Sequence, residues 1–252
     1  MLLQGQGQRV RPVAFLGCFL GAFLTLSLVP VSSGTGGKTQ NHGPTSDQVM
    51  RELDREAKGL HSLTADIERT SVTVVVNDKS TESGRIFLRN DGKLMRIELN
   101  KPDQRVILRN DNKVWHYLPK TKRVEEYDIS KYGALADSLL TIGLGSSGAS
   151  LKKHYLVTVV GEDTVESRKT VELELVPRDE KFRGQIDRIQ LWVDTSTWLA
   201  IQQKFFETGS GDYIIINYRN IATNMKLPEN DFKPRWPKDV TVVKPQSAAS
   251  GQ

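Results

Sequence analysis

The sequence contains little cysteine and histidine, which excludes several classes of protein. Its 252 residues include one cysteine and four histidines. One cysteine cannot build a disulfide framework, a four-cysteine zinc site or an iron–sulfur cluster within the chain. The histidines are scattered and form no H-E-x-x-H pattern. The net charge of +5 is modest for this length and does not by itself indicate a nucleic-acid partner. We therefore expect no metal, no cofactor and no nucleic acid.

Patterns typical of enzyme active sites are also lacking. Residues 143–148 match G-x-G-x-x-G, but they follow a predicted helix instead of a parallel strand, so they do not predict dinucleotide binding. The sequence has no Gly-x-Ser-x-Gly motif for a serine nucleophile. Glu125 and Glu126 are adjacent on a predicted strand end, where their side chains point to opposite faces and cannot act as an acid–base pair. We expect a protein that is not an enzyme.

The N-terminal region has the pattern of a secretory signal. Arg9 and Arg11 precede the apolar run Val13–Val31, and the small residues Ser32–Gly34 follow it. This order is typical of a signal peptide, which we assign to residues 1–33. The alternative is an uncleaved membrane anchor, since the run approaches the ~20 residues that span a bilayer. Either way, the sequence predicts an exported protein of the periplasm.

Cys18 lies inside this apolar run. The preceding Phe15-Leu16-Gly17 loosely resembles a lipobox, in which the cysteine takes a lipid after cleavage. Cleavage there would leave a hydrophobic core shorter than the 7–15 residues of a signal peptide. We therefore place Cys18 within the signal, which leaves a mature chain without cysteine.

The remainder divides into a linker, one folded domain and a tail. By composition, residues 34–45 form a flexible linker, residues 46–243 form the domain, and residues 244–252 form a disordered tail. A helix is predicted to begin at Ser46 or Asp47. Its apolar residues recur at helical spacing: Val49, Met50, Leu53, Ala57 and Leu60.

Most of the domain has the pattern of short strands joined by turns. About ten strands are predicted, and their short links make them antiparallel neighbours in a meander. The fold class is therefore α+β. The predicted strands are residues 71–76, 84–89, 94–99, 105–109, 114–118, 155–160, 170–176, 186–193, 199–206 and 213–218.

A helical segment interrupts these strands. Between Asp128 and Ser150, apolar residues recur at intervals of three and four, and the flexible stretch Gly143–Ser150 ends the segment. A helical insertion within a meander covers one face or mouth of the sheet, so we predict a lid with a glycine-rich hinge. The apolar residues of the insertion include Leu135, Leu139, Leu140 and Ile142.

The strands carry many apolar and aromatic side chains. These residues form either an ordinary filled core or the wall of an interior that holds an apolar ligand. Composition does not decide between the two.

Two groups of motifs resemble the LolA-type carriers of lipoproteins. The first is Gly84-x-Ile-Phe-Leu, Met95-x-Ile-x-Leu and the run Val106–Pro119, which contains Trp-x-Tyr-x-Pro. The second is Tyr218-x-Asn-Ile-x-x-Asn-x-x-Leu-Pro, followed by Phe232, Pro237 and Val240. The resemblance covers roughly residues 47–243. The sequence departs from the family's pattern at Asn112 and Asp239, where the family has glycine.

The resemblance implies an incomplete, strongly curved antiparallel β-barrel with a hydrophobic cavity for acyl chains and no enzymatic turnover. It also implies a monomeric chaperone-like carrier that takes lipoproteins towards the outer membrane, between an inner-membrane transporter and an outer-membrane receptor. Arg89 is the candidate for the family's gating arginine. The cavity residues we predict are Phe87, Ile97, Leu99, Trp115 and Tyr117, and the lid residues are Leu135, Leu139, Leu140 and Ile142.

Two other functions fit the same fold. One is a membrane-tethered envelope sensor or interaction domain with a filled core, and the other is a general lipid-binding protein.

Overall fold

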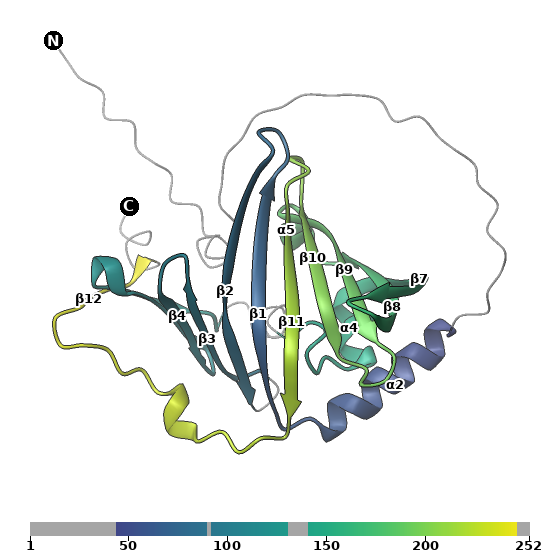
Figure 1. The fold of residues 1–252 in the computed structure, drawn as a ribbon, viewed down its shortest axis with the longest axis horizontal. Coiled ribbons are helices and arrows are strands. Elements are labelled where there is room, and N and C mark those ends of the chain that lie inside the picture. The colour runs from purple at the N-terminus through teal and green to yellow at the C-terminus, as the bar shows by residue number, and fades with distance from the viewer. Residues whose placement is uncertain (1–43, 90–91, 131–140, 246–252) are drawn as a thin grey trace, which may run out of the picture.

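The computed structural model describes residues 44–89, 92–130 and 141–245 (Figure 1). The helices are α2 (Ser46–Gly59), α4 (Gly148–His154) and α5 (Glu180–Arg183), with short 3-10 helices η1 (Pro119–Thr121) and η2 (Glu229–Phe232). The strands are β1 (Ser62–Thr73), β2 (Asp78–Arg89), β3 (Leu94–Lys101), β4 (Arg105–Asn110), β5 (Lys113–Leu118), β6 (Arg123–Asp128), β7 (Tyr155–Val165), β8 (Arg168–Pro177), β9 (Ile186–Asp194), β10 (Ala200–Glu207), β11 (Tyr213–Thr223) and β12 (Thr241–Val243).

The twelve strands form one open, curved sheet in the order β12-β6-β5-β4-β3-β2-β1-β11-β10-β9-β8-β7. The order consists of two antiparallel meanders, β1 to β6 and β7 to β11, which are joined where β1 pairs with β11. Only β12 is parallel to its neighbour, β6, among these pairs of described strands. The predicted mostly antiparallel curved sheet is confirmed, and its first and last long strands lie side by side at its centre.

The structure corrects two details of the predicted strands. Two strands were not among the predicted ten: β6, whose sequence is rich in charged residues, and the three-residue β12. The predicted strand at residues 71–76 is wrong at both ends, because β1 begins at Ser62 and ends at Thr73. Val74, Val75 and Val76 form the turn instead, closed by Asn77 in the left-handed conformation with φ 50°.

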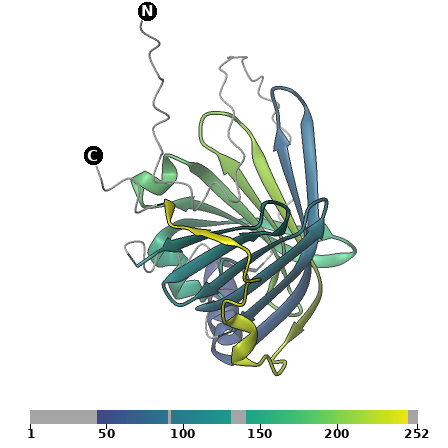
Figure 2. The same cartoon turned by 90° about the vertical axis from the view of Figure 1, so that its left-hand side faces the viewer.

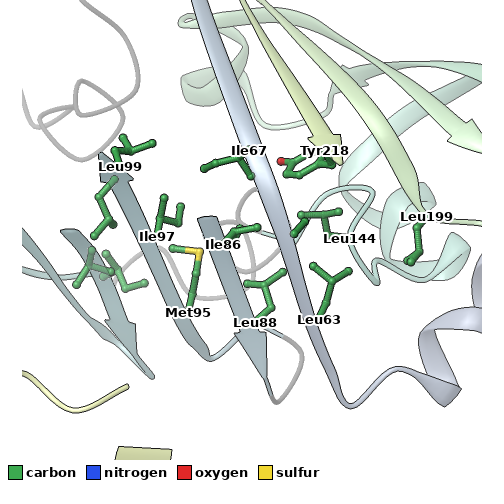
Figure 3. Packing of buried hydrophobic residues seen from close by; sticks show 14 residues of the cluster. Leu63, Ile67, Ile86, Leu88, Met95, Ile97, Leu99, Leu144, Leu199 and Tyr218 are labelled. Atoms are coloured by element: carbon green, nitrogen blue, oxygen red, sulfur yellow. The ribbon is translucent and has the colours of Figure 1, made fainter. Parts of the chain in front are cut away.

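The sheet has an inner face, which we define as the side that packs against α2, α4 and residues 141–147. Because side chains alternate along a strand, every second residue belongs to this face. Two buried clusters cover it. One lies on β1 to β5 and includes Ile67, Ile86 and Ile97 together with Leu144 (Figure 3). The other lies on β7 to β9 and includes residues of both helices.

Helix α2 begins near its predicted start because its N-terminus has a complete capping box. The side chain of Thr45 accepts a hydrogen bond from the backbone of Gln48, and the side chain of Gln48 accepts one from the backbone of Thr45. The helix buries Val49, Met50 and Leu53 against strands β7 to β9. It therefore covers the second meander.

The connection from β6 to β7 crosses from one half of the sheet to the other. Both of its described ends are anchored on the inner face. Ile129 follows β6 directly and joins the first cluster, while Ile142 joins the second. The side-chain amide of Gln203 donates a hydrogen bond of 2.5 Å to the carbonyl of Ile142, and the backbone N–H of Ala200 donates one of 2.8 Å to the carbonyl of Gly143. These contacts attach the end of the connection to β10.

The stretch Gly143–Ser150, which the sequence predicts to be a flexible hinge, packs partly against the rest of the fold, and its role as a hinge stays a prediction. Gly143, Leu144, Ser146 and Gly148 are buried, and the last residues of the stretch begin α4. A Cβ atom added to Gly148 would lie 2.6 Å from the backbone oxygen of Met50, so α4 and α2 are in close contact here. The predicted lid residues Leu135, Leu139 and Leu140 lie outside the described residues.

The outer face of the first meander is covered by the C-terminal strap, which we define as residues 224–243. The strap follows β11, contains η2 and β12, and crosses the strands of the first meander (Figure 2). Phe232 is its most buried described apolar residue, and it packs with Leu94, Leu108 and Trp115. Where the strap crosses it, this half of the sheet is covered on both faces.

We predict that Gly148→Ala destabilises the protein. The added methyl group would collide with the backbone of Met50, and overpacking of this kind costs about 1–3 kcal/mol. The measurement is urea unfolding of the variant and the parent chain. Gly59→Ala is the control, since no atom lies within 4 Å of its added Cβ. Equal stability of the two variants would show that the contact between α2 and α4 is loose.

Candidate ligand-binding site on the inner face

The inner face of the first meander carries an apolar surface that spans three neighbouring strands. Ile97 of β3 is paired with Ile86 of β2 and with Ile107 of β4, so the three side chains lie in one row. Leu99 is paired with Gly84 and continues the surface along β3. The predicted cavity residues Ile97 and Leu99 both lie here, and both are buried (Figure 3).

The other predicted cavity residues lie on the opposite face of the sheet. Phe87 pairs with Thr64 and Arg96, one position away from the inward-facing Ile86. Trp115 pairs with Leu108 and packs in the cluster beneath the strap. The ring of Tyr117 lies 5.1 Å from that of Trp236 of the strap, centroid to centroid. The predicted set therefore does not line one cavity, because side chains alternate along each strand and the strap makes the outer face apolar too.

Arg89 shares the outer face with Phe87, as the alternation predicts. Its Nη1 donates a hydrogen bond of 2.8 Å to the carbonyl oxygen of Leu227 in the strap. Arg96 reaches the carbonyl of Asp231 in the same way, at 3.2 Å. A groove of about 330 Å³ separates Phe87 and these strands from the strap. In this structure Arg89 holds the strap, and its role in gating stays a prediction.

A band of charged residues, which sequence reasoning missed, adjoins the apolar surface on the inner face. Arg69 and Glu82 are paired across β1 and β2, and Arg105 is paired with Leu99. Nη1 of Arg69 lies 2.8 Å from Oε2 of Glu82, and Nη2 of Arg105 contacts the same oxygen. Glu82 is thus shared by two guanidinium groups, of which that of Arg69 is buried and that of Arg105 is partly buried. We call these three residues the arginine–glutamate trio.

His116 and Glu125 extend the charged band onto β5 and β6. The Nδ1 atom of His116 lies 3.7 Å from the carboxylate of Glu125, which also accepts a hydrogen bond of 2.8 Å from the hydroxyl of Tyr127. Burial lowers the pKa of His116, and the nearby charge of Arg105 lowers it further, while Glu125 opposes the shift. His116 is therefore held in its neutral form at neutral pH.

Burial also affects the arginines. It lowers the pKa of Arg69, although Glu82 partly compensates. The Nε atom of Arg105 is buried, and none of the described residues accepts a hydrogen bond from it. An unmet buried donor on a cationic side chain is costly, so this atom suits an acceptor group of a ligand, such as a carboxylate or phosphate oxygen.

Together these residues make the inner face apolar along β2 to β4 and charged at one end. Within the described ranges, no group of three or more histidine, cysteine, aspartate or glutamate residues could hold a metal ion. Across residues 44–89, 92–130 and 141–245, no helix combines the length and the apolar character needed to cross a membrane.

Known proteins resemble this chain in sequence and in fold. A protein-family model described as "-like: Uncharacterized protein" matches residues 89–214, half of the chain. The chain belongs to this family. An uncharacterized protein of Methanocaldococcus jannaschii is 20% identical over 188 residues, which are 75% of this chain. The chain spans about half the length of that curated relative.

Solved structures share the fold. An uncharacterized conserved protein of Thermus thermophilus matches 79% of this chain and 98% of its own, with 13% identity and a TM-score of 0.53. A LolA superfamily protein of Nitrosomonas europaea matches 76% of this chain and 98% of its own, with 12% identity and a TM-score of 0.41. At these identities the likeness shows the fold alone.

We predict that His116 makes the protein less stable in mild acid. Because the pKa of folded His116 lies below the value near 6.5 of an unfolded histidine, the unfolded state binds more protons between the two values. Stability therefore falls as the pH drops through this window. His116→Gln should reduce the loss between pH 7 and pH 5 by on the order of 1 kcal/mol.

The measurement is urea unfolding at the two pH values. His61→Gln is the matched control, since His61 is exposed and lies outside the charged band. The same pH dependence in the parent chain and in His116→Gln would contradict the prediction.

Proposed function

We propose that this protein is a non-enzymatic carrier that binds the acyl chain of an amphiphile on the inner face of the first meander. The observation that supports this most is the continuity between the apolar surface around Ile97 and the arginine–glutamate trio. Leu99 and Arg105 are direct cross-strand partners, so the apolar part ends at a cation. A chain with an anionic group at one end matches this pattern.

The energetics of acyl burial are sufficient for a carrier. Each buried CH₂ contributes about 0.8 kcal/mol, so several methylenes on the inner face would hold a lipid in water. In this structure the surface is already covered, with Ile86, Ile97 and Leu99 only 3–5% exposed. Loading therefore requires a covering segment to move. Ile129 and Leu144 pack in the same cluster, so the connection between β6 and β7 is the segment we expect to move.

The finer proposal concerns cargo and compartment. The motif resemblance and the N-terminal secretory pattern support a periplasmic carrier of lipoproteins, loaded by an inner-membrane transporter and unloaded at an outer-membrane receptor. In this proposal Leu135, Leu139 and Leu140 belong to the lid that closes over the acyl chains, and Ile142 lies at its anchored end.

A second function is favoured by the low exposure of the inner face. Ile97 and Leu99 are already buried. If the connection between β6 and β7 never moves away from them, they are part of a filled core that has no room for a ligand. The protein would then be a membrane-tethered sensor or interaction domain without an acyl ligand.

Ligand binding separates the two functions. We expect mass spectrometry of the intact purified protein to find a co-purifying acylated molecule, and titration with a fluorescent fatty acid to saturate. An absence of both would favour the filled core.

We further predict that Arg105→Gln selectively weakens binding of an anionic amphiphile. The variant removes a partly buried cation, while Arg69 still pairs with Glu82. Affinity for a fluorescent fatty acid should fall at least about tenfold, which corresponds to about 1.4 kcal/mol. Affinity for its uncharged methyl ester should stay the same, because the apolar surface is intact.

Arg96→Gln is the matched control. Arg96 also pairs with a glutamate, Glu98 at 2.6 Å, but on the outer face. The Arg96→Gln variant should bind the fluorescent fatty acid and its methyl ester as tightly as the parent chain does. Equal loss for the acid and the ester in Arg105→Gln would indicate a folding defect and would count against a headgroup site.

A further inference from the structure

The turn between β1 and β2 exposes three consecutive valines. Val74, Val75 and Val76 are 49%, 61% and 69% exposed, which is unusual for apolar side chains next to one another. This hairpin projects beyond its neighbouring strands in both views of the molecule (Figures 1 and 2). The valines therefore form the apolar tip of a protruding arm.

The tip is held in a defined conformation. The backbone N–H of Val74 donates a hydrogen bond of 2.8 Å to Oδ1 of Asp212 in the neighbouring hairpin. The N–H of Asn77 closes the turn by donating one of 3.2 Å to the carbonyl of Val74. Asp212 is buried, and its carboxylate fixes the backbone at the start of the turn. The three valines are thus presented to solvent by the fold, and they are not the loose end of a strand.

A row of aromatic and cationic side chains lies directly behind the tip on the outer face. The strand register places Val72 between Lys79 and Tyr213 in this row. It then continues through Phe206 to Arg188. The guanidinium carbon of Arg188 lies 3.9 Å from the centroid of the Phe206 ring.

Lys204 completes this arrangement. Its Nζ lies 4.5 Å from the ring centroid of Phe206 and 4.1 Å from that of Tyr213. Aromatic rings beside lysine and arginine are typical of the level at which proteins meet lipid headgroups. An apolar tip in front of such a row fits a lipid surface, with the valines below the headgroups and the rings and cations among them.

The small size of the tip also favours lipid over a protein partner. Three valine side chains offer far less than the roughly 800 Å² per partner that a stable protein interface buries. Two of the nearby acidic groups are engaged within the fold, since Asp212 holds Val74 and Asp187 pairs with Arg188 at 2.8 Å. Asp78 and Glu207 remain, so the local charge is nearly balanced, and insertion depends mainly on the valines.

We infer that the β1–β2 tip, Val74–Val76, inserts into a lipid bilayer and docks the protein on it. The inference goes beyond the proposed carrier function, because docking needs no acyl ligand on the inner face. In a carrier, the arm would hold the protein at the membrane where cargo enters or leaves.

The test places a local probe at the tip of the full chain. Cys18, the only cysteine, is replaced by serine, and Val75→Cys is labelled with an environment-sensitive fluorophore. Vesicles of phosphatidylcholine, with and without phosphatidylglycerol, contain lipids with a quencher attached to the acyl chain. We expect quenching at position 75 in both kinds of vesicle. Val160→Cys on β7 is the matched control, because Val160 is also exposed, at 55%, but lies outside the tip.

Val76→Asp in the labelled chain tests the role of the valines. A carboxylate at the tip should reduce quenching at position 75 at least about fivefold, because burying a charge in lipid is unfavourable. Unchanged melting would confirm that the variant folds. The comparison of positions 75 and 160 in one full chain separates tip insertion from any attachment through residues 1–33. Equal quenching at the two positions, or no effect of Val76→Asp, would overturn the inference, while loss of fatty-acid binding would not affect it.

Discussion

The pairing of β1 with β11 is the interaction on which the rest of the structure depends. It joins the two meanders into one sheet, from Leu63 opposite Thr223 to Val72 opposite Tyr213. Without it, the apolar rows on β1 to β5 and on β7 to β10 would belong to two separate sheets. The pairing also requires residues about 150 positions apart to meet, a long-range contact that costs loop-closure entropy before it contributes stability.

Local pattern predicted the elements of this fold well and their arrangement less well. The period of two located most strands, and the period of 3.6 located α2. The pairing of β1 with β11 has no local signal, because neither strand carries information about its distant neighbour. Ile86-Phe87-Leu88 is apolar at every position, so the sequence could not assign its residues to a face until the strap was known.

In the candidate site, too, local pattern predicted some of the residues but not how distant residues come together. Ile97 and Leu99 were found because apolar residues alternate on β3. The charged band was missed because arginine, glutamate and histidine on a strand normally indicate a solvated face. Only the cross-strand register brings Arg69, Glu82 and Arg105 together, and only the covered inner face buries Arg69 and partly buries the other two. Buried ion pairs of this kind repay desolvation poorly, which is why a role in specificity is more reasonable for them than one in stability.

The C-terminal strap has a consequence for the order in which the chain is made. Its residues are synthesised after all the strands whose outer face it covers. Before the strap is synthesised, nothing from it covers Leu94, Leu108 and Trp115. A nascent chain in which the first meander has already formed therefore exposes an aggregation-prone apolar surface. Arg89, Arg96 and Asn110 then bind the strap through its backbone carbonyls. The last twenty or so residues of the domain thus determine whether its first half stays soluble.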